Sequence, residues 1–172
     1  MKPARFEDMI PGCYEPTERR KDLLSNGIFA SVASPRLLGF GGRKVADFKD
    51  KDAARLTVQA WNDYMLDEWV AATPDMFAPM HLLPIRAVEL CVKEHERMMA
   101  TGSKAICFVE DPQFTGLPDY HGGYWEPLFA SAQETAAPIC MYTGSGGAGN
   151  SLVGSPRSPR SLPRSRARRV LR

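Results

Sequence analysis

The sequence lacks the short histidine and cysteine motifs that hold metal ions. Its three histidines, His81, His95 and His121, are too far apart for an HxH or HExxH pair, and its four cysteines form no CxxC pair. It also has no run of about 18 apolar residues, the length that a transmembrane helix needs, and residues 1–8 meet acids where a signal peptide needs an apolar run. We therefore expect a cytoplasmic protein without membrane association, whose cysteines are reduced and buried.

Acidic residues are absent from residues 151–172, which carry seven arginines. The first 150 residues hold the other 15 basic residues and all 20 acidic ones, so the charge changes sign abruptly at this point. The segment resembles the serine/arginine tracts of RNA-binding proteins, but its abrupt onset favours an out-of-frame readout of DNA rich in G and C. In either case we expect residues 150–172 to form a disordered basic tail, and we do not expect nucleic acid to be a partner.

Helical patterns and short apolar runs alternate along residues 16–149, after an irregular segment over residues 1–15. The apolar runs predict buried strands, over residues 28–33, 77–83, 105–109 and 138–143. Amphipathic spacing and capping residues predict helices, over residues 17–27, 51–72, 86–101 and 124–136. Residues 35–50 are expected to be a loop. This alternation is typical of an α/β fold with a parallel sheet whose strands lie side by side in sequence order.

Two architectures fit this pattern, an open doubly wound sheet or part of a (β/α)8 barrel. The glycines at positions 39, 41 and 42 follow the first strand but lack the GxGxxG spacing of a dinucleotide site. We therefore favour a partial (β/α)8 TIM barrel of about four parallel strands with their helices, because a complete barrel needs about 250 residues.

In both architectures a ligand would lie at the carboxyl ends of the strands. Glu110 and Asp111 follow the third apolar run and open a loop that contains Asp119, Tyr120 and His121. Two acids and a histidine at such a place are typical of metal ligands or of an acid and base pair. The alternative is that Asp111 starts a turn and Glu110 pairs with a neighbour.

The other two histidines are expected to be structural. His81 lies inside the second apolar run, where a core position is the simplest interpretation. His95 stands between Glu94 and Glu96 in a predicted helix, which indicates a position at the helix surface or its boundary.

Several stretches together resemble the amidohydrolase-related family of the metal-dependent amidohydrolase superfamily, in the branch that includes aminocarboxymuconate and hydroxybenzoate decarboxylases. They are residues 16–33, 60–69, 77–84, 105–112 and 116–144. The resemblance implies a barrel that binds a divalent metal, zinc or manganese, at the carboxyl ends of its strands. It also implies metal-dependent hydrolysis, or non-oxidative decarboxylation, of a small carboxylate or cyclic substrate.

The chain departs from this family at the metal ligands that the resemblance implies. The family's His-x-His or Glu-x-His pair on the first strand would lie before Met1, the histidine of the fifth strand aligns with Tyr142, and the aspartate of the eighth strand would lie beyond Gly149. We therefore expect a truncated, inactive copy that does not bind the family's metal.

If catalysis survives, we expect Glu110 and His121 to act as acid and base, and Asp119, Tyr120 and Tyr142 to contact substrate. Two alternatives stay open, a non-catalytic module for subunit interaction, including homo-oligomer formation, and RNA binding through the basic tail.

Overall fold

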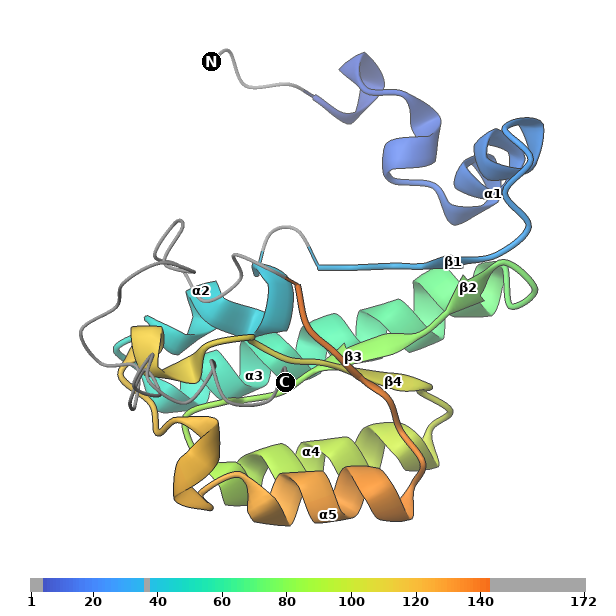
Figure 1. Ribbon diagram of the computed structural model, residues 1–172. Coiled ribbons are helices and arrows are strands. Elements are labelled where there is room, and N and C mark those ends of the chain that lie inside the picture. Colours follow the sequence, from blue (N-terminus) through green and yellow to red (C-terminus); the bar gives the residue numbers. More distant parts are fainter. Residues whose placement is uncertain (1–4, 36–37, 143–172) are drawn as a thin grey trace, which may run out of the picture.

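The computed structural model describes residues 5–35 and 38–142 (Figure 1). Short parallel strands alternate with helices along the chain. The strands are β1 (Ser31–Val32), β2 (Phe77–Ala78), β3 (Met80–Leu82), β4 (Ala105–Cys107) and β5 (Ile139–Cys140). The helices are α1 (Pro16–Ser25), α2 (Arg43–Ala46), α3 (Lys51–Tyr64), α4 (Val88–Ala100) and α5 (Glu126–Glu134). A π-helical turn, η4 (Met65–Val70), extends α3, and five short 3-10 turns complete the order: η1 (Phe6–Asp8), η2 (Pro11–Cys13), η3 (Phe40–Gly42), η5 (Pro112–Thr115) and η6 (Tyr120–Gly122).

All strand pairs are parallel and follow sequence order. β1 pairs with β2, and β3, β4 and β5 form a second sheet with β4 in the middle. Only Pro79 separates β2 from β3, so the two sheets share one continuous extended segment. Figure 1 shows α4 and α5 side by side along one side of β3 and β4. This is the arrangement expected of consecutive β/α units, and it confirms the predicted partial barrel.

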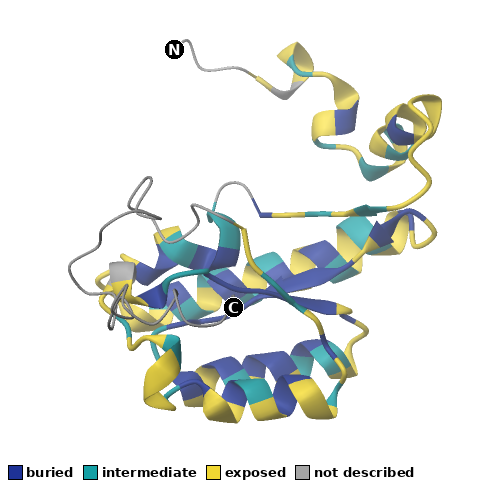
Figure 2. Cartoon of the chain, viewed as in Figure 1, coloured by how far each residue is buried: buried dark blue, intermediate teal, exposed yellow. Residues whose placement is uncertain are grey.

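Apolar side chains cover the sheet on both faces. One buried cluster joins Ile106 and Phe108 to Trp125 and Leu128 near α4 and α5. A second cluster packs the opposite side chains of β3 and β4 against α2 and α3: its buried members are Val45, Ala54, Val58, Met80, Leu82, Ala105 and Cys107. Figure 2 shows this burial as dark blue along the sheet and the helix faces that turn toward it. A sheet covered on both faces explains why β4 has a continuous apolar sequence and no alternation.

Asn62 of α3 completes the hydrogen bonding of β3 on the edge opposite β4. Its side-chain amide accepts a hydrogen bond from Leu82 N (2.8 Å) and donates one to Leu82 O (3.0 Å). It also donates to Glu94 Oε1 (2.7 Å), and Asn62 itself is fully buried. The side chain therefore takes the place of a neighbouring strand, because among the described strands β1 pairs with β2 and not with β3.

Several predicted elements differ from those observed. The strand predicted over residues 28–33 is reduced to β1, and the burial predicted for it is wrong, since Phe29 is 84% exposed and Ile28 41% exposed. The loop predicted over residues 35–50 contains η3 and α2, and the irregular segment contains η1 and η2. Cys13 is exposed and Cys140 only half-buried, whereas Cys91 and Cys107 are buried as expected. All four thiols are free.

Two further expectations lie at or beyond the edge of the structure. The end of the strand predicted over residues 138–143 and the tail at residues 150–172 reach outside the described residues. Within those residues, no helix has both the length and the apolar character that a membrane span requires.

Candidate functional site

The carboxyl ends of β4 and β5 meet the loop of residues 111–123. Glu110 and Asp111 follow β4, and Met141 and Tyr142 follow β5. Because the strands are parallel and adjacent, these ends lie at the same edge of the sheet. This is the edge where the sequence predicts a site.

Backbone turns fix the course of the loop. Gly116 and Gly123 have φ values of 77° and 76°, in the left-handed region that glycine enters without strain. Asp119 Oδ1 accepts hydrogen bonds from His121 N (2.9 Å) and Gly122 N (3.1 Å). Trp125 Nε1 donates to Pro118 O (2.9 Å), which ties the loop to the start of α5. One oxygen of Asp119 is therefore used to cap η6.

Tyr120 anchors the loop to the strand ends. Its hydroxyl donates to Val109 O and lies 3.9 Å from Met141 Sδ. Its ring packs against the rings of Phe108 and Phe129, with both centroid distances at 6.0 Å. Burial, together with the charges of Asp111 and Glu110, raises the pKa of Tyr120 above its ordinary value. The phenol is therefore neutral at physiological pH and serves as a hydrogen-bond donor.

Two carboxylates lie beside this phenol. Burial, followed by the charge of Glu110, raises the pKa of Asp111, while a hydrogen bond from Gln113 opposes the rise. A carboxyl group with a raised pKa is suited to proton transfer, because its pKa moves toward physiological pH. We call Glu110, Asp111 and Tyr120 the strand-end cluster.

The other predicted site residues lie more toward solvent. His121 is exposed, although its backbone is held by Asp119. Tyr142 is 67% exposed, and its ring centroid lies 5.7 Å from that of Phe40. The structure thus brings Glu110 and Tyr120 together, keeps Asp119 and His121 on the covering loop, and places Tyr142 at the neighbouring strand end.

His81 and His95 form a buried hydrogen-bonded pair between β3 and α4. His81 Nε2 lies 3.1 Å from His95 Nδ1, and both residues are fully buried. Ser103 Oγ lies 2.8 Å from His81 Nδ1, and Thr135 Oγ1 lies 2.9 Å from His95 Nε2. The structural role expected for His81 agrees with this position, but the position predicted for His95, at the surface of the helix or its boundary, is wrong because the residue is fully buried.

Hydroxyl groups flank the pair at both ends. The Thr135 hydroxyl also lies 2.8 Å from Ser131 O, and the Ser103 hydroxyl lies 3.2 Å from Pro79 O, so each hydroxyl has both a carbonyl and an imidazole within reach of its one proton. The hydrogen-bonded chain Ser103–His81–His95–Thr135 is therefore compatible with either direction of donation. Burial favours the neutral form of both rings. Burial, followed by the charges of His95 and Arg97, lowers the pKa of His81 to about 3, and burial also lowers the pKa of His95.

The described residues do not fit the metal that the family resemblance implies. Within residues 5–35 and 38–142, no group of three or more His, Cys, Asp or Glu side chains is arranged to hold an ion. Two of the three imidazoles, those of His81 and His95, are hydrogen-bonded to each other between β3 and α4. The phenol of Tyr142, at the expected ligand position, is a poor ligand because its ordinary pKa is about 10.

Comparison with known proteins decides the family. The family model described as amidohydrolase matches residues 15–166. The chain belongs to the amidohydrolase family. The match runs beyond Gly149 into the arginine-rich segment. No curated protein matches the chain.

Solved structures of amidohydrolases and decarboxylases share the fold. A 5-carboxyvanillate decarboxylase from Novosphingobium aromaticivorans, with bound manganese and a nitrobenzoic acid, is 22% identical with a TM-score of 0.63, over 81% of this chain and 38% of its own. A dihydroxybenzoic acid decarboxylase from Polaromonas, with manganese and 2-nitroresorcinol, is 21% identical with a TM-score of 0.56, over 70% and 36%. A 4-oxalomesaconate hydratase from Rhodopseudomonas palustris is 18% identical with a TM-score of 0.57, over 81% and 42%.

The present chain thus spans about two fifths of the length of these similar structures. Its alternating parallel strands and helices correspond to part of an amidohydrolase barrel. At identities of 18–22%, this similarity shows a shared fold and does not show a shared activity.

Proposed function

We propose that this chain forms a part of an amidohydrolase barrel that faces the substrate. The proposed family reaction is metal-dependent hydrolysis, or non-oxidative decarboxylation, of a small carboxylate or cyclic compound. We propose further that the 172-residue chain by itself does not catalyse this reaction. The observation that carries the proposal is the strand-end cluster, which has two carboxylates and a phenol but no imidazole. Two of the similar structures are decarboxylases that contain manganese and a bound phenolic compound, which supports a small cyclic compound as the substrate class.

Within this proposal each site residue has a limited role. Glu110 is the proposed acid or base, because it lies at the end of β4 and contributes to the raised pKa values of Asp111 and Tyr120. His121 is the proposed second proton-transfer group, since its exposed ring can turn toward a ligand above the strand ends. Asp119 has one oxygen left for substrate after it caps η6.

Tyr120 and Tyr142 are the proposed substrate contacts. The Tyr120 hydroxyl donates to Val109 O, so toward substrate it offers its oxygen as an acceptor. Tyr142 offers an exposed aromatic face beside Phe40, which suits a planar ring. No step of the reaction is assigned to a metal, because the described residues do not supply a set of ligands for one.

A decarboxylation assay tests the proposal. The full chain is incubated with 2,6-dihydroxybenzoate or 5-carboxyvanillate in the presence of manganese or zinc, and carbon dioxide release is measured. We expect no release above that of the Glu110→Gln variant. Glu89→Gln serves as the matched control, because Glu89 is an exposed glutamate of α4 that does not belong to the strand-end cluster.

Metal-dependent turnover would contradict the inactivity of the chain. If Glu110→Gln then lowered this turnover about 100-fold while Glu89→Gln did not, the role of Glu110 as acid or base would stand. Metal-dependent turnover that is above background and equal in all three proteins would remove Glu110 from the mechanism.

A further inference from the structure

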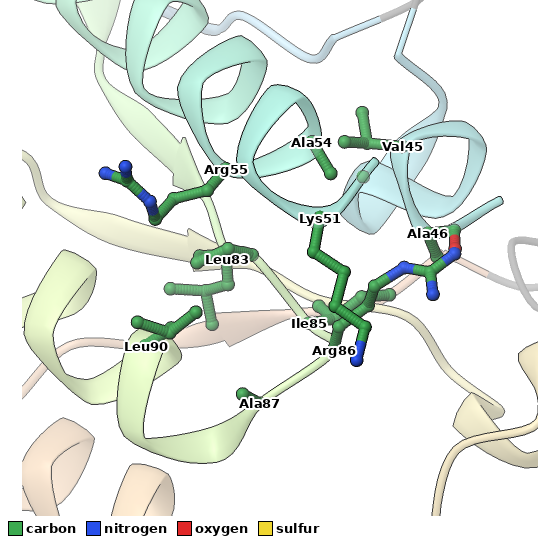
Figure 3. A pocket seen from close by; sticks show the side chains of 12 residues that line it. Val45, Ala46, Lys51, Ala54, Arg55, Leu83, Ile85, Arg86, Ala87 and Leu90 are labelled. Carbon is green, nitrogen blue, oxygen red and sulfur yellow. The ribbon is translucent and has the colours of Figure 1, made fainter. Parts of the chain in front are cut away.

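A small cavity lies between α2, α3 and the segment that joins β3 to α4. Its volume is ≈ 80 Å³, and most of its lining is apolar. Figure 3 shows Val45, Ala54, Leu83 and Leu90 among the side chains around it. None of its lining residues belongs to the strand-end cluster, so it is a separate site.

The charged residues that line this cavity are all basic. They are Lys51, Arg55 and Arg86, and no acidic residue lines the cavity. Within the described part of the chain, none of the three forms an ion pair. The guanidinium of Arg55 donates to Gln59 Oε1 (3.0 Å) and points away from the other two in Figure 3, so Lys51 and Arg86 are the cations that would attract an anion in the cavity.

Arg86 has a donor that is left over for a ligand. Its guanidinium donates to Ala46 O, while its Nε atom is buried and has no hydrogen-bond partner among the residues that the structure describes. Burying an N–H group without an acceptor costs free energy, and the cost is larger for a charged group. Figure 3 shows the Arg86 and Lys51 side chains at one end of the cavity, with the guanidinium of Arg86 turned toward Ala46. An acceptor bound there would satisfy the arginine and face both cations.

The carboxylates near these residues along the chain do not line the cavity; they are Asp47, Asp50, Asp52 and Glu89. Asp50 caps α3, where its Oδ1 accepts from Asp52 N (2.9 Å) and Ala53 N (3.0 Å). Glu89 in the first turn of α4 is exposed, and neither Asp50 nor Glu89 lines the cavity. The N-cap residue of α4, Ala87, offers no side-chain acceptor and lines the cavity, so the positive end of this helix adds to the attraction for an anion.

We infer that this cavity binds a small organic monocarboxylate, with its carboxylate at Arg86 and Lys51 and its apolar part against Leu83 and Ile85. An inorganic anion would leave the apolar lining uncovered, and a neutral apolar molecule would leave Arg86 Nε without an acceptor. The carboxylate is therefore the ligand class that uses both halves of the cavity. The inference does not depend on the proposed function, because the two sites share no residue.

A pair of probes of equal shape tests the inference. Isobutyrate and isobutyramide are titrated into the full chain near neutral pH at low salt, and binding is followed by calorimetry and by amide NMR shifts. We expect isobutyrate to bind and to shift the amides of Ala54, Ala87 and Leu90. The amide should bind at least about tenfold more weakly, because it lacks the charge-assisted hydrogen bonds.

Three variants locate the binding. Arg86→Met keeps the apolar stem of the side chain and should weaken isobutyrate binding about tenfold or more. Ala54→Leu fills the cavity and should abolish binding. Lys44→Gln is the control, since it removes one positive charge from α2 at a residue that does not line the cavity, and it should leave the affinity within about twofold.

Three results would overturn the inference. They are equal binding of isobutyrate and isobutyramide, unchanged binding in a folded Ala54→Leu protein, and no saturable binding of isobutyrate up to about 50 mM. Circular dichroism verifies the fold of each variant. If Arg86→Met does not fold, the comparison of the two probes and the Ala54→Leu variant still decide the question.

Discussion

Exchange of Asn62 for aspartate tests how α3 stabilises the open edge of β3. The substitution keeps the shape of the side chain and its acceptor for Leu82 N, but it removes the donor that serves both Leu82 O and Glu94 Oε1. A buried acceptor left without a donor costs about 1–3 kcal/mol, and more when it is charged. The new carboxylate also faces Glu94, which is itself buried. We therefore expect Asn62→Asp to lower the free energy of unfolding by about 3 kcal/mol or more at neutral pH.

The neighbouring residue provides the control. Asp63 is exposed and pairs with Arg97 at 2.6 Å, so Asp63→Asn makes the reverse exchange one position along the same helix. It should cost less than about 1 kcal/mol. Urea unfolding followed by tryptophan fluorescence measures both values, and Asn62→Asp should lower the Tm by about 6–12 °C. A cost for Asn62→Asp no larger than that for Asp63→Asn would refute the edge-completing role of Asn62.

Two further predictions concern the buried histidines and Gly41, a glycine of η3 that packs against the backbone following β4. Because the fold lowers the pKa of His81 from 6.5 to about 3, the unfolded chain binds more protons below pH 6.5, so stability should fall as the pH drops through this window. The loss from His81 should reach about 2 kcal/mol at pH 5; urea unfolding of the His81→Gln variant should show a shallower pH dependence, whereas His121→Gln, at an exposed ring, should match the original protein. Gly41→Ala should cost more than about 3 kcal/mol, because a Cβ there would lie 2.5 Å from a backbone nitrogen of the β4 end. Gly116→Ala, with similar φ but open space, should cost about 1 kcal/mol, and comparable thermal denaturation of the two variants would contradict the close approach at Gly41.

The order of strands and helices could be predicted because each element carries its own pattern. Residues 105–109 form a continuous apolar run, which a strand covered on both faces requires. The helix predicted over residues 86–101 differs from α4 by two residues at its start and one at its end. Such local patterns do not depend on distant contacts.

Burial depends on what lies across from a residue, and local sequence does not contain this information. Residues 28–33 are apolar, yet only β1 pairs, and Phe29 remains 84% exposed. His95 stands between two glutamates, which indicated a surface position, although its spacing from Cys91 placed it on the inner face of α4. That spacing was the signal that could have identified its burial.

The place of the candidate site could be expected from the sequence, but its residue roles remain predictions. Glu110 follows β4, and parallel strands end at the same edge of a sheet, so Glu110 and the loop that carries Tyr120 were expected at this edge. The cavity at Arg86 joins residues of α2, α3 and the β3–α4 segment. No spacing in the sequence connects these three regions, so the cavity could be found only in three dimensions.

Manganese binding by the full chain tests the central claim most directly. Equilibrium dialysis against manganese, with the bound metal measured by mass spectrometry, gives the number of ions held per chain. The account predicts far less than one ion per chain, because the imidazoles of the described residues are either paired with each other or exposed. One tightly bound ion per chain that Glu110→Gln or His121→Gln releases would contradict it.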